Sequence, residues 1–480
     1  MPTPNPQRER YDLVVVGTGF ASSFFLSRYL QGAAPRARIL VLERGRVDPH
    51  PWQVKYRKNS SFPKPAHIDR NPKKHWEYTL GFGGTSNRWW ACTPRCMPND
   101  FRLASLYGQG RDWPVGYEEL EPYYERVEEV MQVSGPSGAT PFPRRKPYPQ
   151  PPHLPTEPDR VLARAHPRGF FQQPTARASR ALPRRPRCCA NGTCTICPVN
   201  AKFTIQNGLD EPYADERVQV IWDARVERVL TRGDSVTSVQ YAMEEAQATH
   251  TVDADLVVLG ANALFNPHIL LRSEIEHPLL GKRLVEQVGQ NIAVYLDGLD
   301  NFQGSTSITG HGYMLYDGEH RKERAGCLIE AFNIPSMRAE HGRWRQVLRL
   351  KCIFEDLPSE ENRVVVNEAD PRKAEAVFSA HSQYTQRGID SLPGLLPEIL
   401  KALPVESIEM RGLNKTEAHI LGTTVMGDDP ATSVIDKHQV HHRYRNLVVL
   451  GGGAFPTAPP ANPTLTISAL TLFAADHLLG

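Results

Sequence analysis

The apolar positions near the start of the chain predict a strand, a helix and a second strand in succession. Residues 11–16 (YDLVVV) form a short apolar run that is typical of a buried strand. A glycine turn follows at 17–19, and the segment over about 20–30 favours a helix. A second strand over 38–42 ends at Glu43. This order predicts a βαβ unit.

Further along the chain, the apolar positions first repeat with a helical period and then alternate with polar positions. A spacing of i, i+3, i+4, i+7 predicts a helix over about 117–133, whose buried face consists of Leu120, Tyr123, Tyr124, Val127, Val130 and Met131. Strands are expected within 218–240 and over 254–259, and helices over 390–403 and 462–479. From about 291 to 385 alternating runs predict a separate antiparallel sheet: IAVYLDGL, GYMLYDG, GCLIEAFNI, VLRLKCIFE, RVVVNE and AEAVFSA. The fold class is therefore α/β, or α+β overall.

Length and charge exclude several classes of protein. The chain has 480 residues, 40% of them hydrophobic, so it can bury a sizeable core. The 56 basic residues less the 53 acidic ones leave a net charge of +3, which argues against nucleic acid as a partner. No run of about 18 apolar residues occurs, so no membrane span is expected. The first ten residues lack the pattern of a secretory signal, which favours a cytoplasmic location.

The glycine turn after the first strand has the chemistry of a dinucleotide site. Gly17 permits a tight turn, and Gly19 lets the backbone approach a pyrophosphate at the N-terminus of the next helix. Ser22 stands at the third position of the GxGxxG pattern and is small enough for close helix–strand packing. Glu43 can accept hydrogen bonds from both ribose hydroxyls. At this point NAD and FAD are both possible ligands.

Four of the eight cysteines fall in one short loop as CC-x4-C-x2-C: Cys188, Cys189, Cys194 and Cys197. A disulfide framework is not expected in so long a chain without a secretory signal. Thiolates at this spacing can converge on an iron–sulfur cluster. A structural zinc site and reduced thiols without a metal are the alternatives.

The segment before the cysteines, residues 141–187, is basic and rich in proline. It holds 12 prolines and 11 Lys or Arg residues against two acidic ones. One interpretation is an excursion held on the surface, and the other is a docking face for an acidic partner.

The motifs, in their order, resemble the glucose–methanol–choline (GMC) oxidoreductase family over nearly the whole chain. The matching pieces are the N-terminal turn with Glu43, GFGGTSNRWW at 81–90, DWPVGYEELEPYYERVEEV at 112–130, GANALFNPHILLRS at 260–273, and the C-terminal HILGTTVMG, NLVVLGGGAFPT and ANPTLTISAL. YGQGRDWP at 107–114 and RCCANGTCTICPVNAKFT at 187–204 are most similar to the catalytic subunits of bacterial FAD-dependent glucose and glucoside dehydrogenases.

The resemblance implies a Rossmann-like FAD-binding domain and a substrate domain built on an antiparallel sheet. The FAD-binding domain would be discontinuous, over 1–50, 75–110, 200–290 and 411–480. The substrate domain and its excursions would take 51–74, 111–187 and 291–410, with the cysteine loop at 188–199.

The resemblance also implies a set of FAD contacts. Gly83, Gly84, Thr85 and Asn87 would lie against the isoalloxazine and ribityl chain, Val226 against adenine, and Gly452 and Ala454 on the C-terminal side of the flavin; Arg44, Ala261 and Thr464 complete the set. Gly451 stands where the family often has Asp, so one acidic contact to the ribityl chain or pyrophosphate is missing or replaced. No histidine occurs in 81–90, so FAD is expected to be dissociable rather than covalently attached.

By resemblance, His419 in EAHILGTTVMG and Asn462 in PPANPTLT flank the reacting carbon. A neutral imidazole can take a hydroxyl proton, and an amide can hold the oxygen as alkoxide character grows. The structural alternatives are an ordinary packed histidine and a helix cap.

The implied function is an FAD-dependent dehydrogenase that oxidises an alcohol or hemiacetal group of a sugar or glycoside by hydride transfer to flavin N5. Electrons would leave through a [3Fe–4S] cluster held by three of the four loop cysteines, toward a cytochrome or a small companion subunit. A signal-bearing partner could carry the folded chain to the periplasm. The alternatives are an oxidase that reduces dioxygen to hydrogen peroxide, and a non-redox flavin-dependent lyase.

Overall fold

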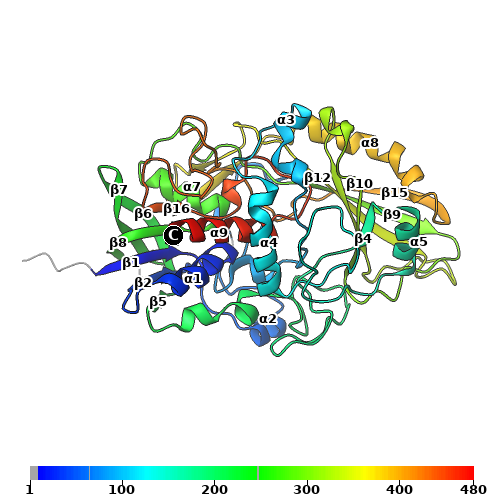
Figure 1. Cartoon of the computed structure of the whole chain (residues 1–480), viewed down its shortest axis with the longest axis horizontal. Helices are drawn as coiled ribbons and strands as arrows, with labels where there is room; N and C mark the ends of the chain where they lie inside the picture. Colours follow the sequence, from blue (N-terminus) through cyan, green and yellow to red (C-terminus); the bar gives the residue numbers. More distant parts are fainter. Residues whose placement is uncertain (1–8, 64, 246–247) are drawn as a thin grey trace, which may run out of the picture.

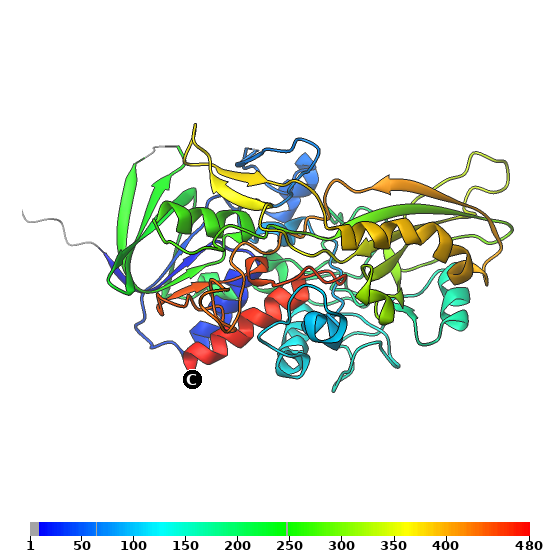
Figure 2. The same cartoon turned by 90° about the horizontal axis from the view of Figure 1, so that it is seen from above.

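Two large β-sheets lie at opposite ends of the molecule, with helices and long loops between them (Figures 1 and 2). The computed structural model describes residues 9–63, 65–245 and 248–480. No helix in these ranges is long and apolar enough to cross a membrane.

The first sheet has seven strands and begins with the predicted βαβ unit. Its order is β5-β2-β1-β8-β7-β6, with β16 also paired to β8. Strand β1 is parallel to both β2 and β8, whereas β6, β7 and β8 are antiparallel. The bounds are β1 Arg10–Val16, β2 Ile39–Leu42, β5 Val218–Ile221, β6 Ala224–Arg232, β7 Ser235–Met243, β8 Thr249–Leu259 and β16 Leu447–Val449. Helices α1 (Phe20–Gly32) and α9 (Thr464–Leu479) pack against each other beside this sheet (Figure 1).

The second sheet has six antiparallel strands in the order β15-β9-β12-β11-β10-β4. It confirms the antiparallel interpretation of the first four alternating runs, because these form β9 to β12. The bounds are β4 Phe170–Gln172, β9 Val288–Leu296, β10 Ile308–Leu315, β11 Cys327–Phe332, β12 Val347–Phe354 and β15 Val405–Leu413. Helix α8 (Gln383–Leu400) packs against β12 (Figure 2).

The last two runs do not join this sheet, so that part of the prediction was wrong. They form β13 (Arg363–Val366) and β14 (Ala374–Val377), which make a third sheet with β3 (His67–Asp69). Alternation identifies a strand with one buried face, but it does not identify the partner strand. Here the partner is β3, which lies about 300 residues earlier and pairs in parallel with β14.

The predicted helix over 117–133 is α4 (Tyr117–Met131), but its buried face differs from the prediction. Val130 is 37% exposed, whereas Glu121 and Glu128 are buried. The reason is the fully buried Arg95, whose guanidinium lies 3.1 Å from the Glu121 carboxylate and 2.9 Å from that of Glu128. A count of apolar positions cannot anticipate a buried ion-pair network.

Short elements complete the fold. The helices are α2 His50–Tyr56, α3 Leu103–Tyr107, α5 Glu157–Ala165, α6 Ile205–Gly208 and α7 Asn262–Arg272. The 3-10 turns are η1 Gly84–Asn87, η2 Pro98–Phe101, η3 Glu211–Ala214, η4 Glu319–Lys322 and η5 Gly452–Ala454.

Candidate active site

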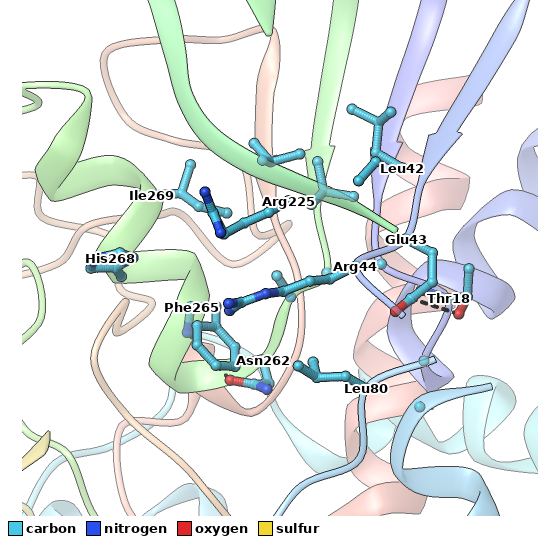
Figure 3. Close-up of a pocket in the computed structure, with 18 of the residues that line it drawn as sticks. Thr18, Leu42, Glu43, Arg44, Leu80, Arg225, Asn262, Phe265, His268 and Ile269 are labelled. Atoms are coloured by element: carbon cyan, nitrogen blue, oxygen red, sulfur yellow. Dashed lines mark hydrogen bonds between the residues drawn. The ribbon is translucent and has the colours of Figure 1, made fainter. Parts of the chain in front are cut away.

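A first cavity lies at the carboxyl ends of β1, β2 and β8, the edge where doubly wound sheets bind nucleotides (Figure 3). The turn after β1, the residues after β2, the glycine loop at 79–85, strand β6 and helix α7 form its lining. Eight of the predicted cofactor residues line it: Gly17, Gly19, Glu43, Arg44, Gly84, Thr85, Val226 and Ala261.

The turn after β1 has the shape that a pyrophosphate needs. Gly17 has a φ of +89°, and a Cβ there would lie 2.9 Å from the Gly260 carbonyl oxygen. Gly19 has open space where its Cβ would be. Helix α1 begins at this point, no side chain in the described ranges caps it, and its first turn holds no acidic residue. Its first N–H groups are therefore free to bind phosphate oxygens, so this turn fits the pyrophosphate of FAD.

Ser22 and Glu43 stabilise the turn through hydrogen bonds. Ser22 Oγ donates to the Val16 carbonyl oxygen over 3.1 Å. Glu43 accepts four hydrogen bonds, from Thr18 N and Oγ1 at 3.0 and 2.8 Å and from the backbone N–H groups of Gly45 and Gly81, both at 2.9 Å. The carboxylate thus ties the turn to the glycine loop at 81, and its contact with a ribose stays a prediction.

Basic side chains surround the other end of this cavity. Figure 3 shows Arg44 and Arg225 reaching into the space between the end of β2 and helix α7. Both pair with Glu244, at 2.5 and 3.0 Å. Sequence reasoning included Arg44 but missed Arg225, and also Arg272 and Arg372, which line the same cavity. Arginines scattered along the chain give no local signal that they will meet.

A second cavity lies against the second sheet, with residues of β9 to β12 in its lining, and contains both predicted catalytic residues. His419, Asn462 and Thr464 line it, and Thr85 lines both this cavity and the first. The two cavities therefore meet at turn η1. Two further predicted cofactor residues, Gly83 and Asn87, lie at this turn. Gly83 donates its N–H to Thr18 Oγ1 over 3.1 Å, and Asn87 keeps a buried Oδ1 without a partner among the described residues.

Gly452 and Ala454 form turn η5 and are buried. They are not among the residues that line either cavity in the described part of the chain. Their backbone oxygens accept from Gly422 and Met426 over 3.0 and 2.9 Å. The structure thus makes them neighbours of the segment that follows His419, and their contact with the flavin stays a prediction.

His419 is held by one hydrogen bond on its ring. Nδ1 lies 3.0 Å from Gln287 Oε1, and no partner of Nε2 occurs among the described residues. Removal from water lowers the pKa of His419 to about 4, although the nearby Glu417 opposes that shift. The imidazole is therefore neutral at pH 7 and can accept a proton.

Asn462 is buried two residues before helix α9 begins. Its Nδ2 lies 3.5 Å from Glu330 Oε1, a weak contact, and its Oδ1 has no partner in the described ranges. An amide with unused hydrogen-bonding capacity in a cavity can hold a ligand hydroxyl.

Five polar side chains that line the second cavity form what we call the polar ladder: Asn291, Asn414, Glu417, Lys351 and Glu330. Asn291 donates to Asn414 over 2.6 Å, and Asn414 donates to Glu417 over 2.6 Å. Lys351 Nζ lies 2.8 Å from Glu417 and 3.2 Å from Glu330. Burial alone would lower the pKa of Lys351, but the two carboxylates raise it above its ordinary value. No motif in the sequence marked this ladder.

The four loop cysteines do not form a ligand set in this structure. Cys194 Sγ donates to Ser307 Oγ over 3.0 Å, Cys197 Sγ accepts from Ala201 N over 3.2 Å, and Cys188 Sγ lies 3.5 Å from Thr306 Oγ1. Cys189 is exposed. Among the described residues, no three His, Cys, Asp or Glu side chains are placed to hold a metal ion. The thiols as placed do not fit a cluster.

The basic segment 141–187 is partly neutralised within the fold. Arg144 and Arg145 pair with Glu128 and Glu121, at 2.7 and 3.1 Å, and Arg184 pairs with Asp210 at 2.6 Å. These ion pairs attach the basic segment to α4 and to the segment after α6. They leave less positive charge available to bind a partner.

The first cavity fits a dinucleotide, and the second brings a neutral histidine and an amide together beside it. The chain belongs to the GMC oxidoreductase family, since residues 11–294 and 358–471 match its N-terminal and C-terminal regions. The chain is therefore an oxidoreductase, and FAD is its implied cofactor.

Curated relatives and solved structures are similar over nearly the whole length. The chain is 28% identical to the fructose dehydrogenase large subunit of Gluconobacter japonicus, over 98% of this chain and 97% of that protein. It is 25% identical to paromamine 6'-oxidase of Streptomyces fradiae, over 98% and 91%. Pyridoxine 4-oxidase from Mesorbium loti has the same fold, with a TM-score of 0.68 at 18% identity over 97% of this chain and 99% of that one.

A substitution at Gly19 tests the assignment of the first cavity. We expect Gly19→Val to lower FAD affinity by about tenfold or more, because the valine fills the space beside the helix N-terminus that the pyrophosphate requires. The measurement is FAD titration of the apoprotein by flavin fluorescence. Gly138→Val is the matched control, since that glycine also has open space around it. Equal FAD affinity in the two variants would contradict the assignment.

Proposed function

We propose that this protein is an FAD-dependent dehydrogenase that oxidises a hydroxyl-bearing carbon of a sugar or glycoside. The observation that carries the proposal is the meeting of His419 and Asn462 in one cavity, next to the cavity that fits FAD. FAD, when bound, supplies the acceptor for the hydride that leaves the carbon.

Residues of the chain account for the transfer of the hydroxyl proton. His419 is neutral, and its Nε2 can accept the hydroxyl proton of the substrate. Asn462 holds the same oxygen as negative charge grows on it. The residues bind and position the alcohol, and a proton ends on His419 for each molecule oxidised.

The lining of the second cavity supports a sugar rather than a simple alcohol. Trp90, Phe332 and Ile308 give it an apolar part, and the rings of Trp90 and Phe332 lie 6.0 Å apart. The polar ladder supplies carboxylate, ammonium and amide groups in the same cavity. A sugar has apolar C–H faces and a rim of hydroxyls, so it can use both parts at once. The name of the relative fructose dehydrogenase agrees with this class of substrate.

An oxidase is the second candidate, because paromamine 6'-oxidase and 6'''-hydroxyparomomycin C oxidase are relatives over most of the chain. A non-redox lyase receives no support from relatives named as dehydrogenases and oxidases.

We also propose that three of the four loop cysteines hold a [3Fe–4S] cluster once iron and sulfide are supplied, after the loop has moved to bring them together. The support is electrostatic. Arg177 and Lys202 are buried beside the loop, and no carboxylate lies within ion-pair distance of either one in the described ranges. Lys202 Nζ donates to the backbone oxygen of Cys194 over 2.7 Å, and Arg177 Nη1 lies 3.9 Å from Cys194 Sγ. Burial lowers the pKa of Lys202 to about 7, so Arg177 is the buried cation that keeps its full charge. A buried cation needs an anionic neighbour, and a thiolate at Cys194 would provide it.

One preparation tests the dehydrogenase and the cluster together. We expect the anaerobically purified holoenzyme to contain about three irons per FAD with matching acid-labile sulfide, as the proposed cluster requires. We expect its turnover with sugar to use a one-electron acceptor such as ferricyanide, with hydrogen peroxide a minor product in air. Iron near zero at full FAD occupancy would contradict the cluster. Peroxide in proportion to the sugar consumed would favour the oxidase. A cytochrome or a companion subunit is the proposed natural acceptor.

A further inference from the structure

We propose that Gln287 is a positioning residue that holds His419 in the Nδ1–H tautomer and fixes the distance between His419 and Asn462. The inference rests on the proposed function, and it concerns a residue to which neither the sequence pattern nor the family resemblance assigned a role.

The hydrogen bonds of Gln287 determine the orientation of its amide. The side chain is 1% exposed, and its Nε2 donates to the carbonyl oxygens of Pro459 and Ala461 over 2.8 and 3.0 Å. A backbone carbonyl can only accept, so the atom that faces both of them must be the NH₂ group. The alternative amide orientation would put an oxygen against two oxygens. Gln287 Oε1 therefore faces His419.

The tautomer of His419 follows from that orientation. Gln287 Oε1 can only accept, and it lies 3.0 Å from His419 Nδ1. Nδ1 must then carry the hydrogen, and a neutral imidazole has only one. Nε2 is left with its lone pair and without a partner among the described residues. This is the state that can take a proton from a substrate hydroxyl.

The neighbouring residue, Glu286, holds the backbone of the same histidine. Its Oε2 accepts from Thr416 Oγ1, Glu417 N and His419 N over 3.1, 3.2 and 3.3 Å. Lys74 pairs with the same carboxylate. Ala418 lies within this segment with a φ of +60°, a conformation that is unfavourable for a non-glycine residue and needs such support. Two consecutive residues therefore hold the backbone and the ring of His419.

Gln287 also reaches the segment that carries Asn462. Its two acceptors, Pro459 and Ala461, stand three residues and one residue before Asn462. One amide thus bonds to His419 on one side and to the backbone of the Asn462 segment on the other. The two proposed catalytic residues are 43 positions apart in the chain, and this amide links their segments directly.

The tautomer can be observed without any turnover. The probe is the ¹⁵N spectrum of the His419 ring in the histidine-labelled holoenzyme, identified by its absence from His419→Asn. We expect a protonated Nδ1 and an unprotonated Nε2 at pH 7. A protonated Nε2 would overturn the inference. This result does not depend on the substrate, so it stands even if the proposed function fails.

Variants at Gln287 give the kinetic test, by anaerobic flavin reduction as a function of pH. Gln287→Met removes all three hydrogen bonds at similar volume. We expect its reduction rate to fall at least about tenfold, with about 10⁴-fold as the ceiling for a histidine left in the wrong tautomer, while the substrate concentration for half-saturation changes little. Gln53→Met is the matched control, because Gln53 is also buried and donates to a backbone carbonyl, at Asp48.

Gln287→Glu separates positioning from a general structural role. The charged groups around His419 are Glu417, Lys351 and Glu330, together with Glu286 at its backbone N–H and Lys74 paired to Glu286, and they are unchanged in this variant. In this variant the carboxyl group accepts from Nδ1, but its other oxygen faces the carbonyl oxygens of Pro459 and Ala461, to which it can donate only when protonated. Where this carboxyl ionises, it stabilises the imidazolium, so the acid limb of the rate profile should move from below pH 5 to higher pH. A Gln287→Met rate equal to that of Gln53→Met would overturn the inference. If His419→Asn itself keeps the wild-type rate, the proposed function fails, and the tautomer measurement still decides the role of Gln287.

Discussion

Replacing His419 with asparagine lowers the rate of anaerobic flavin reduction by sugar by about 10²–10⁴-fold, the usual contribution of a positioned general base. The reason is that, among the described residues that line the second cavity, no other side chain offers a neutral imidazole as a base. Lys351 is the nearest candidate of another type, and its two carboxylate neighbours raise its pKa above the ordinary value, so it keeps its proton. Stopped-flow absorbance of the flavin gives the rate directly, independent of the electron acceptor.

The control for this prediction is His250→Asn on strand β8. His250 stacks on Tyr241 near the first residue of β8, whose opposite end borders the first cavity, and it lines neither cavity in the described part of the chain. We expect that variant to reduce its flavin at the wild-type rate. A His419→Asn enzyme that retains FAD and reacts as fast as His250→Asn would remove His419 from the chemistry.

Replacing Lys351 with methionine lowers the free energy of unfolding by about 3–5 kcal/mol at pH 8, the cost of leaving buried charges without their partner. Lys351 Nζ lies between Glu417 and Glu330, at 2.8 and 3.2 Å. Without the ammonium, two buried carboxylates of like charge remain. Thermal unfolding of the holoenzyme, or denaturant unfolding where it is reversible, measures the loss.

The loss of unfolding free energy in Lys351→Met should become smaller as the pH falls, because the pKa of Glu330 sets its direction. In the wild type, burial would raise the pKa of Glu330, but Lys351 and His311 hold it well below its usual range. Its contribution to stability is therefore present above the unfolded pKa of about 4.3. In Lys351→Met we expect the pKa of Glu330 to rise above its unfolded value. Protonation of Glu330 then removes the repulsion between the two buried carboxylates as the pH falls from 8 to 5. A loss that is equal at both pH values would contradict this account.

Two further variants set the scale of the Lys351 effect. Adding Glu417→Gln to Lys351→Met removes one of the unpaired charges and should recover part of the stability. Lys401→Met breaks the exposed pair with Glu398 and should change the free energy of unfolding by less than about 1 kcal/mol. If Lys351→Met costs no more than Lys401→Met, the polar ladder is not a buried charge network.

The sequence predicts those parts of the fold that depend on neighbouring residues. The βαβ unit was predictable because its strands, turn and helix are continuous in the chain, and the turn needs Gly17 at φ +89°. The assignment of β13 and β14 failed because they pair with each other and β14 pairs with the distant β3. The same limit applies to α4, where Arg95 allows two glutamates to be buried.

The candidate site shows the same division between local and distant information. His419 and Asn462 could be named because each lies in a motif of its own. Gln287 could not, since it meets His419 across 132 positions of the chain, and a glutamine between Glu286 and Val288 has no distinctive pattern. Lys351 and Glu417 meet across 66 positions in the same way. The loop cysteines are the opposite case, since their spacing suggested a ligand set and the structure does not bring them together.

Anaerobic mixing of the FAD-loaded enzyme with sugars, glycosides and simple alcohols, followed by flavin absorbance, tests the central claim most directly. The account predicts that at least one sugar or glycoside bleaches the oxidised flavin fully, that simple alcohols bleach it far more slowly, and that His419→Asn stays oxidised on the same timescale. A flavin that stays oxidised with every sugar and glycoside, or one that only simple alcohols reduce, would contradict it.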